Sequence, residues 1–119
     1  MPSEARLAAF VAAVLSNQHD QAIADFYTPD STMQENQAPP RRGREANVAR
    51  EAAVLARATV RSEIVGPVFV SGDRVVLRYR FRFERADGTG FAMEEIAYQR
   101  WDGDYIAEEQ FFYDPAQRN

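Results

Sequence analysis

Three glutamates occur where apolar and polar residues alternate, which is the pattern of a β-strand with one buried face. Glu35 follows Met33 by two residues, and Glu95 and Glu109 lie on the apolar faces of two later segments. Carboxyl groups held close together among apolar side chains raise one another's pKa, because burial and like charge both disfavour ionisation. A carboxyl group that titrates near neutral pH is suited to general acid/base catalysis. These glutamates are therefore the candidate chemical groups.

A second interpretation of the same glutamates is open, because arginines alternate with apolar residues in the segment before Glu95. If Asp87 and Gly88 form a two-residue hairpin loop, Arg80 lies opposite Glu95 and forms a structural ion pair with it. A register shift by one residue brings Phe81 to that position instead. The sequence leaves open whether these carboxylates are chemical groups or partners in structural ion pairs.

Other kinds of site have little support in the sequence. His19 is the only histidine, and it lies in a turn between two predicted helices, where a structural role is expected. One histidine with scattered carboxylates has no metal-ligand spacing. The sequence also has no glycine-rich phosphate loop and no nucleophile motif. We therefore expect neither a metal nor a cofactor.

The first half of the chain has the pattern of helices. Apolar residues recur at helical spacing within residues 7–15, and Ser3 is a suitable N-cap for that helix. A short second helix carries Phe26 and ends before Pro29. The predicted elements that follow are a brief strand over residues 30–36, a loop over 37–42 and a third helix over 43–58. We expect the helices to bury five apolar side chains against a sheet: Leu7, Phe10, Val14, Phe26 and Leu55.

The second half changes to a period of two residues, which is the mark of strands. Turn signals at Gly72, Gly88 and Gly103 divide it into four strands, and such tight connections make neighbouring strands antiparallel. The predicted strands are residues 59–71, 74–86, 89–101 and 105–113. Three helices before a four-strand meander exclude a doubly wound parallel sheet and predict an α+β fold. In the predicted register, one sheet face carries eleven residues: Phe91, Met93, Glu95, Ala97, Gln99, Trp101, Tyr105, Ala107, Glu109, Phe111 and Tyr113.

Size and charge limit the class of protein. A chain of 119 residues is predicted to form one domain over residues 1–119. The net charge of −4 argues against nucleic acid as a partner, because non-specific binding to phosphates relies on a positive field. The apolar run at residues 7–15 is too short to span a membrane. The absence of cysteine fits a cytoplasmic location.

Three segments together resemble the nuclear-transport-factor-two-like superfamily, in its SnoaL-like and ketosteroid-isomerase-like branch. Residues 22–32 (AIADFYTPDST) resemble its second helix and first strand, and residues 43–45 (GRE) resemble the opening of its third helix. Residues 101–106 (WDGDYI) and 112–115 (FYDP) resemble its last hairpin. The resemblance implies a cone-shaped, curved antiparallel sheet wrapped around three helices, with a pocket at the open end. It also implies a homodimer formed through the sheet, where Ile96, Tyr98 and Phe112 make the outer face apolar.

The resemblance gives each candidate residue a role. Glu35 occupies the position of the general base of ketosteroid isomerases, and Tyr27 matches a tyrosine that supports their oxyanion hole. The two oxyanion-hole donors fall on Val11 and Ala97, which have no group to donate, so ketosteroid isomerisation itself is rejected. We expect Glu35 to be the base and Glu109 or Tyr113 to be the acid or orienting group. Four further residues are expected to line the pocket: Tyr27, Met93, Glu95 and Phe111.

The expected ligand is a small apolar molecule, of cyclic or polyketide-like shape, on which the glutamates perform general acid/base chemistry. The alternative is a binding module of the same fold without catalysis. Met33 is apolar and is expected to face the core, and Glu35, two residues later, lies on the same face of the strand. We therefore expect Glu35 to point into the pocket, where loss of hydration raises its pKa. An arginine that reached Glu35 from the 74–86 strand would reverse that expectation.

Overall fold

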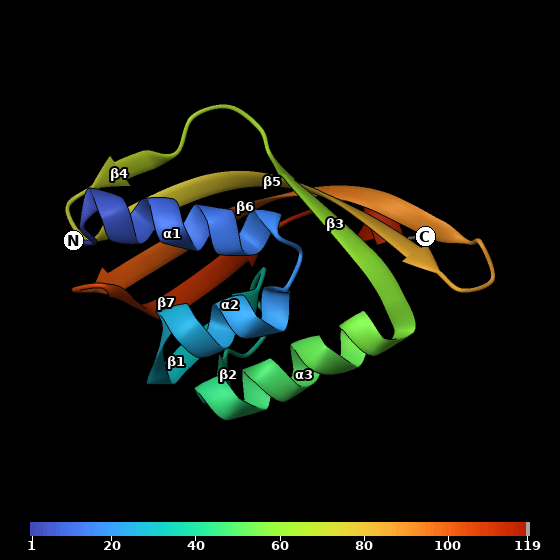
Figure 1. Cartoon of the computed structure of the whole chain (residues 1–119), viewed down its shortest axis with the longest axis horizontal. Helices are drawn as coiled ribbons and strands as arrows, with labels where there is room; N and C mark the ends of the chain where they lie inside the picture. The colour runs from blue at the N-terminus through green and yellow to red at the C-terminus, as the bar shows by residue number, and fades with distance from the viewer. Residues whose placement is uncertain (119) are drawn as a thin grey trace.

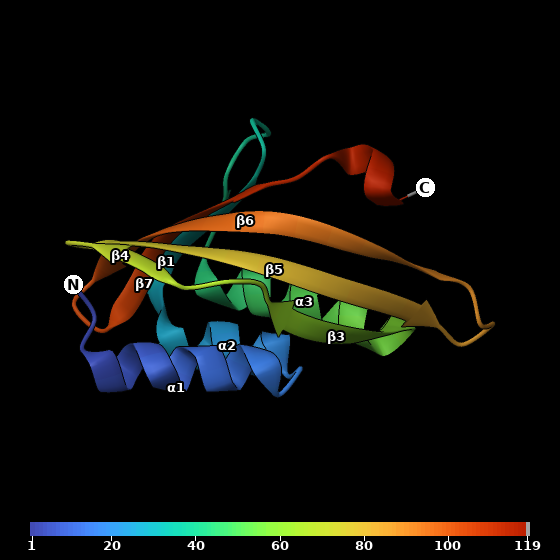
Figure 2. The ribbon, with the colours of Figure 1, turned by 90° about the horizontal axis from the view of Figure 1, so that it is seen from above.

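The computed structural model describes residues 1–118 and confirms the α+β class. Three helices come before the long strands of the sheet: α1 (Glu4–Leu15), α2 (His19–Phe26) and α3 (Arg44–Arg57). All three helices lie on the same side of the sheet (Figures 1 and 2). The strands curve around them, which gives the expected cone shape (Figure 1).

One sheet of seven strands forms the other layer. Its strands are β1 (Tyr27–Glu35), β2 (Arg41–Arg42), β3 (Ala58–Ile64), β4 (Phe69–Ser71), β5 (Arg74–Arg85), β6 (Gly90–Asp102) and β7 (Tyr105–Phe112). They run in the order β2-β1-β7-β6-β5-β3, and β4 also pairs with β5. A 3₁₀ turn, η1 (Pro115–Arg118), follows β7.

The sheet differs from the predicted antiparallel meander in three places. Strand β1 pairs with β7 in parallel, so the sheet is mixed. The predicted 59–71 strand is divided into β3 and β4 at Gly66 and Pro67, because Gly66 has a φ of +75° and proline has no backbone N–H for a ladder. Strand β1 begins at Tyr27 rather than at residue 30, and β2 forms within the predicted loop.

The hairpin between β5 and β6 decides which side chains meet near Glu95. The N–H of Arg85 bonds to the carbonyl oxygen of Thr89 at 2.8 Å, so the loop has three residues and Gly88 takes a φ of +87°. Tyr79 therefore lies opposite Glu95, and Arg80 lies opposite Glu94. Both registers left open by the sequence, with Arg80 or Phe81 opposite Glu95, are wrong.

The hydrophobic core lies where helices α1 and α2 pack against the middle of the sheet. Ser3 caps α1 as predicted, since its side chain accepts a hydrogen bond from the N–H of Arg6. The ring of Phe10 contacts Phe26 and Trp101 edge to face at centroid distances of 5.5 and 5.7 Å. Phe10, Val14 and Phe26 are buried as predicted, whereas Leu7 and Leu55 are only partly buried. Leu55 was wrongly placed in the core, because Asn47 is the one fully buried residue of α3.

A register shift in the last hairpin moves one predicted cavity residue to the surface. Trp101 pairs with Ile106, although the neighbouring Arg100 pairs with Glu108. This bulge turns Ile106 into the core and leaves Tyr105 48% exposed. Tyr105 does not share the inner face with Glu109, contrary to the prediction.

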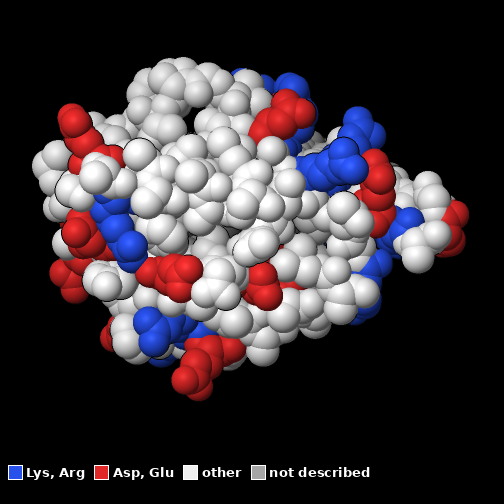
Figure 3. Space-filling model, viewed as in Figure 1, with Lys and Arg blue, Asp and Glu red and all other residues white. Residues whose placement is uncertain are grey.

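The outer side of α1 is rich in alanine. Ala5, Ala8, Ala9 and Ala12 are exposed there, and Figure 3 shows an uncharged centre on this face with charged side chains around its edge. None of the helices within residues 1–118 combines the length and apolarity needed to cross a membrane.

Candidate functional site

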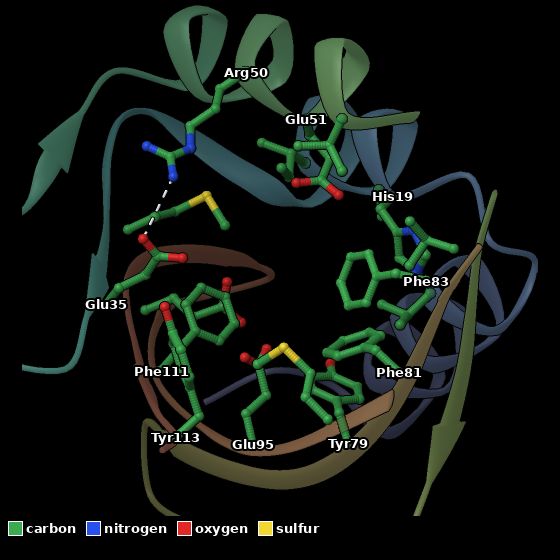
Figure 4. A pocket seen from close by; sticks show the side chains of 18 of the residues that line it. His19, Glu35, Arg50, Glu51, Tyr79, Phe81, Phe83, Glu95, Phe111 and Tyr113 are labelled. Carbon is green, nitrogen blue, oxygen red and sulfur yellow. Dashed lines mark hydrogen bonds and ion pairs between the residues drawn. The ribbon is translucent and has the colours of Figure 1, made fainter. Parts of the chain in front are cut away.

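A cavity of about 180 Å³ lies between the concave face of the sheet and helices α2 and α3. Pockets for drug-sized ligands are typically about 300–1,000 Å³, so this cavity suits a smaller molecule. Its wall is mostly apolar, and several carboxyl groups reach it (Figure 4). All seven residues predicted for the site line this one cavity: Tyr27, Glu35, Met93, Glu95, Glu109, Phe111 and Tyr113.

Glu109 lies at the inner end of a chain of hydrogen bonds. Its carboxyl group accepts one bond from the hydroxyl of Tyr27 and one from Nε2 of Gln99 at 2.6 Å. The indole N–H of Trp101 donates to Oε1 of Gln99 at 2.9 Å. Because indole can only donate, it fixes the Gln99 amide with its oxygen toward Trp101 and its NH₂ group toward Glu109.

The surroundings of Glu109 act in opposite directions on its ionisation. Burial disfavours the charged form, while the bonds from Tyr27 and Gln99 favour it, and the balance raises the pKa of Glu109 to about 7. The pKa of Tyr27 lies well above its usual value, because its hydroxyl is buried beside this carboxylate. Tyr27 therefore stays protonated and remains a donor.

Glu95 has a different environment from Glu109. Its side chain points into the cavity (Figure 4), and within residues 1–118 its carboxyl group has no hydrogen bond or ion pair. Burial is the main cause that raises the pKa of Glu95 to about 8, followed by the charges of Glu109, Glu35 and Glu51, while Arg118 acts in the opposite direction. Near neutral pH, Glu95 is therefore protonated while Glu109 is at its midpoint.

Glu35 lies at the opposite side of the cavity, and two arginines bind it. Its Oε2 is 3.1 Å from Nη1 of Arg41 in β2 and 3.4 Å from Nη2 of Arg50 in α3. Figure 4 shows the pair with Arg50. The prediction that Glu35 points into the cavity is confirmed, and of the two possibilities left open for it, the one with an arginine partner is found. The arginines come from β2 and α3, not from the 74–86 strand. Tyr113 lies beside Glu35, and burial together with that negative charge raises the pKa of Tyr113.

His19 and Glu51 also line the cavity, and the sequence interpretation missed both. Glu51 comes three residues after Val48 and four before Leu55, so the helical period that predicted a buried face also placed Glu51 beside it. Burial raises the pKa of Glu51 and lowers that of His19, which is therefore neutral at pH 7. His19 begins α2 rather than lying in a turn before it.

The other missed residues form an aromatic wall along β5. Tyr79, Phe81 and Phe83 follow one another on the inner face, with ring centroids 5.1 and 6.2 Å apart. The sequence left open whether Arg80 or Phe81 faces the cavity, and the structure places Phe81 there, with Tyr79 and Phe83 on the same face. The site thus combines two carboxyl groups that titrate near neutral pH with an aromatic surface, an arrangement suited to proton transfer on a small organic molecule.

Comparison with known proteins agrees with this architecture. The family model of the SnoaL-like domain matches residues 7–109. No curated protein matches the chain at the sequence level.

Solved structures of similar shape share little sequence with the chain. A protein with a ketosteroid isomerase-like fold from Catenulispora acidiphila, in complex with trimethylamine, is 20% identical over 92% of this chain and 88% of that one, with a TM-score of 0.77. An LEH-like epoxide hydrolase from M. tuberculosis is 13% identical over 95% and 83% of the two chains, with a TM-score of 0.78. A nuclear-transport-factor-two-like protein of unknown function from Burkholderia pseudomallei is 14% identical over 93% and 92%, with a TM-score of 0.74. At such identities these similarities establish the fold, and the activity has to be argued from the residues.

Proposed function

Because the chain belongs to the SnoaL-like domain family, we propose that its cavity binds a small, mostly apolar molecule and that two glutamates transfer a proton on it. The family and the neighbouring structures support a pocket protein, and the carboxyl groups supply the chemistry. The cavity volume of about 180 Å³ favours a molecule with a single ring over one with several fused rings.

One observation carries this proposal: Glu95 and Glu109 face the same apolar cavity with pKa values of about 8 and about 7. Glu109 accepts hydrogen bonds from Tyr27 and Gln99, which favour its ionised form, whereas no hydrogen bond within residues 1–118 favours the ionised form of Glu95. Two carboxyl groups in such different environments can divide the roles of base and acid between them. We assign Glu95 as the general acid and Glu109 as the base, with Tyr113 as a donor that orients the ligand. Glu35 loses its predicted role as base, because Arg41 and Arg50 hold its charge.

The catalytic proposal is tested by exchange of carbon-bound protons. Small cyclic ketones in D₂O exchange the hydrogens next to the carbonyl group when a base removes them, and NMR follows the exchange. We expect acceleration by the wild-type protein that is reduced at least tenfold by Glu95→Gln and by Glu109→Gln. Glu84→Gln is the matched control, since Glu84 is exposed and is not among the residues that line the cavity.

The alternative function is a binding module without catalysis. Two observations favour a binding module: Glu109 accepts two hydrogen bonds within the protein, and Glu35 forms two ion pairs. Such contacts also stabilise a fold. Ketones that bind without any accelerated exchange would support this alternative.

We further propose a homodimer that forms through the outer face of the sheet. Tyr98 and Phe112 are exposed on that face, and Ile96 is partly exposed beside them. Apolar groups gathered on a surface are typical of an interface. A cytoplasmic location remains a prediction from the absence of cysteine.

A further inference from the structure

Acidic and basic side chains both line the cavity, and most of the acidic ones form no ion pair within residues 1–118. Four glutamates line it: Glu35, Glu51, Glu95 and Glu109. Of these four glutamates, only Glu35 forms ion pairs within residues 1–118, and its partners are Arg41 and Arg50. Arg118 also lines the cavity, but it is exposed in the last turn of the chain. Glu51 and Glu95 therefore face the cavity without an ion pair or a hydrogen bond in the described residues, although Arg50 and Arg118 lie near enough to favour their ionised forms.

Three further polar groups of the residues that line the cavity lack a hydrogen-bond partner within residues 1–118: the hydroxyl of Tyr79, Nδ1 of His19 and the donor Nε of Arg41. The side chain of Tyr79 is 2% exposed, and its hydroxyl group makes no hydrogen bond within residues 1–118. Nε2 of His19 is paired with the hydroxyl of Ser62, and Nδ1 is buried without a partner. When Nε2 donates to Ser62, Nδ1 is left as an acceptor. A buried polar group without a partner is costly, so an N–H donor that reached Nδ1 of His19 would stabilise the site, and the hydroxyl oxygen of Tyr79 is a second acceptor.

The remaining wall is aromatic. Tyr79, Phe81 and Phe83 on β5 face the same space as Phe111 and Tyr113 (Figure 4). Aromatic ring faces attract cations, most strongly where water is excluded. Carboxylates, acceptor atoms and ring faces together make this cavity complementary to a positive charge attached to an apolar body.

We propose that the ligand of this cavity is an organic cation, a small amine that binds in its protonated form. This inference rests on the proposed function, since it names the class of molecule that the same cavity takes. The inference also extends the proposed function, because a neutral apolar ligand would leave the carboxyl groups of Glu51 and Glu95 and the unpaired acceptor atoms without partners.

A cationic ligand changes the protonation of the site in a defined direction. Its charge favours ionised carboxyl groups, so it lowers the pKa of Glu95 and Glu109 and drives protons off them. Glu35, Glu51, Arg118 and His19 face the same cavity, and an added positive charge favours proton loss from each titratable one. A neutral ligand only removes water, which raises carboxyl pKa values and causes proton uptake. The sign of the proton change on binding therefore distinguishes the two classes.

Isothermal titration calorimetry tests the inference with two probes of similar shape, cyclohexylamine and cyclohexanol. An aliphatic amine keeps its proton to about pH 10, as lysine does, so at pH 7.5 the first probe is a cation and the second is neutral. Titrations in two buffers of different ionisation enthalpy give the number of protons exchanged. We expect the amine to bind at least tenfold more tightly than the alcohol and to release protons on binding.

Variants assign the effect to the carboxyl groups. Glu95→Gln and Glu51→Gln are each expected to weaken amine binding at least fivefold while alcohol binding stays within twofold, and Glu84→Gln is expected to change neither. Unchanged alcohol binding by a variant shows that its cavity is intact. If Glu95→Gln fails to fold, the amine affinity of Glu51→Gln tests the role of the carboxyl groups.

Equal affinity for both probes, or proton uptake with the amine, would overturn the organic-cation inference and leave the proposed function in place. If neither probe binds, both the inference and the proposed binding function are wrong for ligands of this size. If ketone exchange fails while the amine binds with proton release, the inference stands and the catalytic part of the proposal is wrong.

Discussion

The replacement Glu95→Gln should make the protein more stable at alkaline pH. The folded protein keeps a proton on Glu95 up to a pKa of about 8, whereas the unfolded chain releases it at the ordinary value of 4.5. Between these values the folded state binds more protons than the unfolded state, so its free energy of unfolding falls as pH rises. Glutamine has the same shape but carries no titratable proton, and it removes this pH dependence.

The size of the effect follows from the pKa shift. Each pKa unit corresponds to about 1.4 kcal/mol, so the complete interval represents at most about 4–5 kcal/mol. Part of the carboxyl group faces the open cavity, which makes this value an upper limit. The wild-type protein should lose about 1 kcal/mol more than the variant between pH 7 and pH 8. His19 contributes equally to the wild-type protein and to the variant, and burial keeps its folded pKa below 6.5, so it does not account for a difference between them in this interval.

Urea unfolding followed by tryptophan fluorescence measures this difference. Trp101 is the only tryptophan and is 1% exposed, so its emission reports loss of the core. Glu84→Gln, on the surface, should follow the wild-type curve. If Glu95→Gln also retains the wild-type slope between pH 7 and pH 8, Glu95 does not titrate in that range and its assignment as the acid fails.

Three other predictions concern the hydrogen-bond chain, the core and the outer face. Trp101→Phe should let the Gln99 amide turn its oxygen toward Glu109 and raise the pKa of Glu109 above about 7, as measured by carboxyl NMR. An unchanged value would mean that Trp101 does not fix the amide. Phe26→Ala should lower the free energy of unfolding by about 3–5 kcal/mol, because it empties a buried site, and a loss below about 1 kcal/mol in urea would contradict the packing described. Light scattering at micromolar concentration should give a dimer mass for the wild type and a monomer mass for Phe112→Arg, whereas a wild-type monomer would refute the proposed interface.

Much of the site was predictable from the sequence because the side-chain face of a strand is a local property. Met33 and Glu35 are two residues apart, so they share a face in any extended segment, and Glu95 and Glu109 follow the same rule. Helical spacing, Pro29 and the glycine turns set the order of elements equally well. These signals act over a few residues, which is why the three helices and most of the strands were predicted and why all seven predicted site residues line one cavity.

The partner of each carboxyl group was decided only by the tertiary structure. Arg41 and Arg50 reach Glu35 because β2 and α3 return to β1, and no local pattern gives that contact. A three-residue loop rather than a two-residue loop turned Arg80 outward to Glu94 and left Glu95 beside Tyr79. The sequence determined which glutamates face inward, because strand period is local. The fold decided which of them is paired and which is free to exchange a proton, because pairing depends on segments that are distant in the chain.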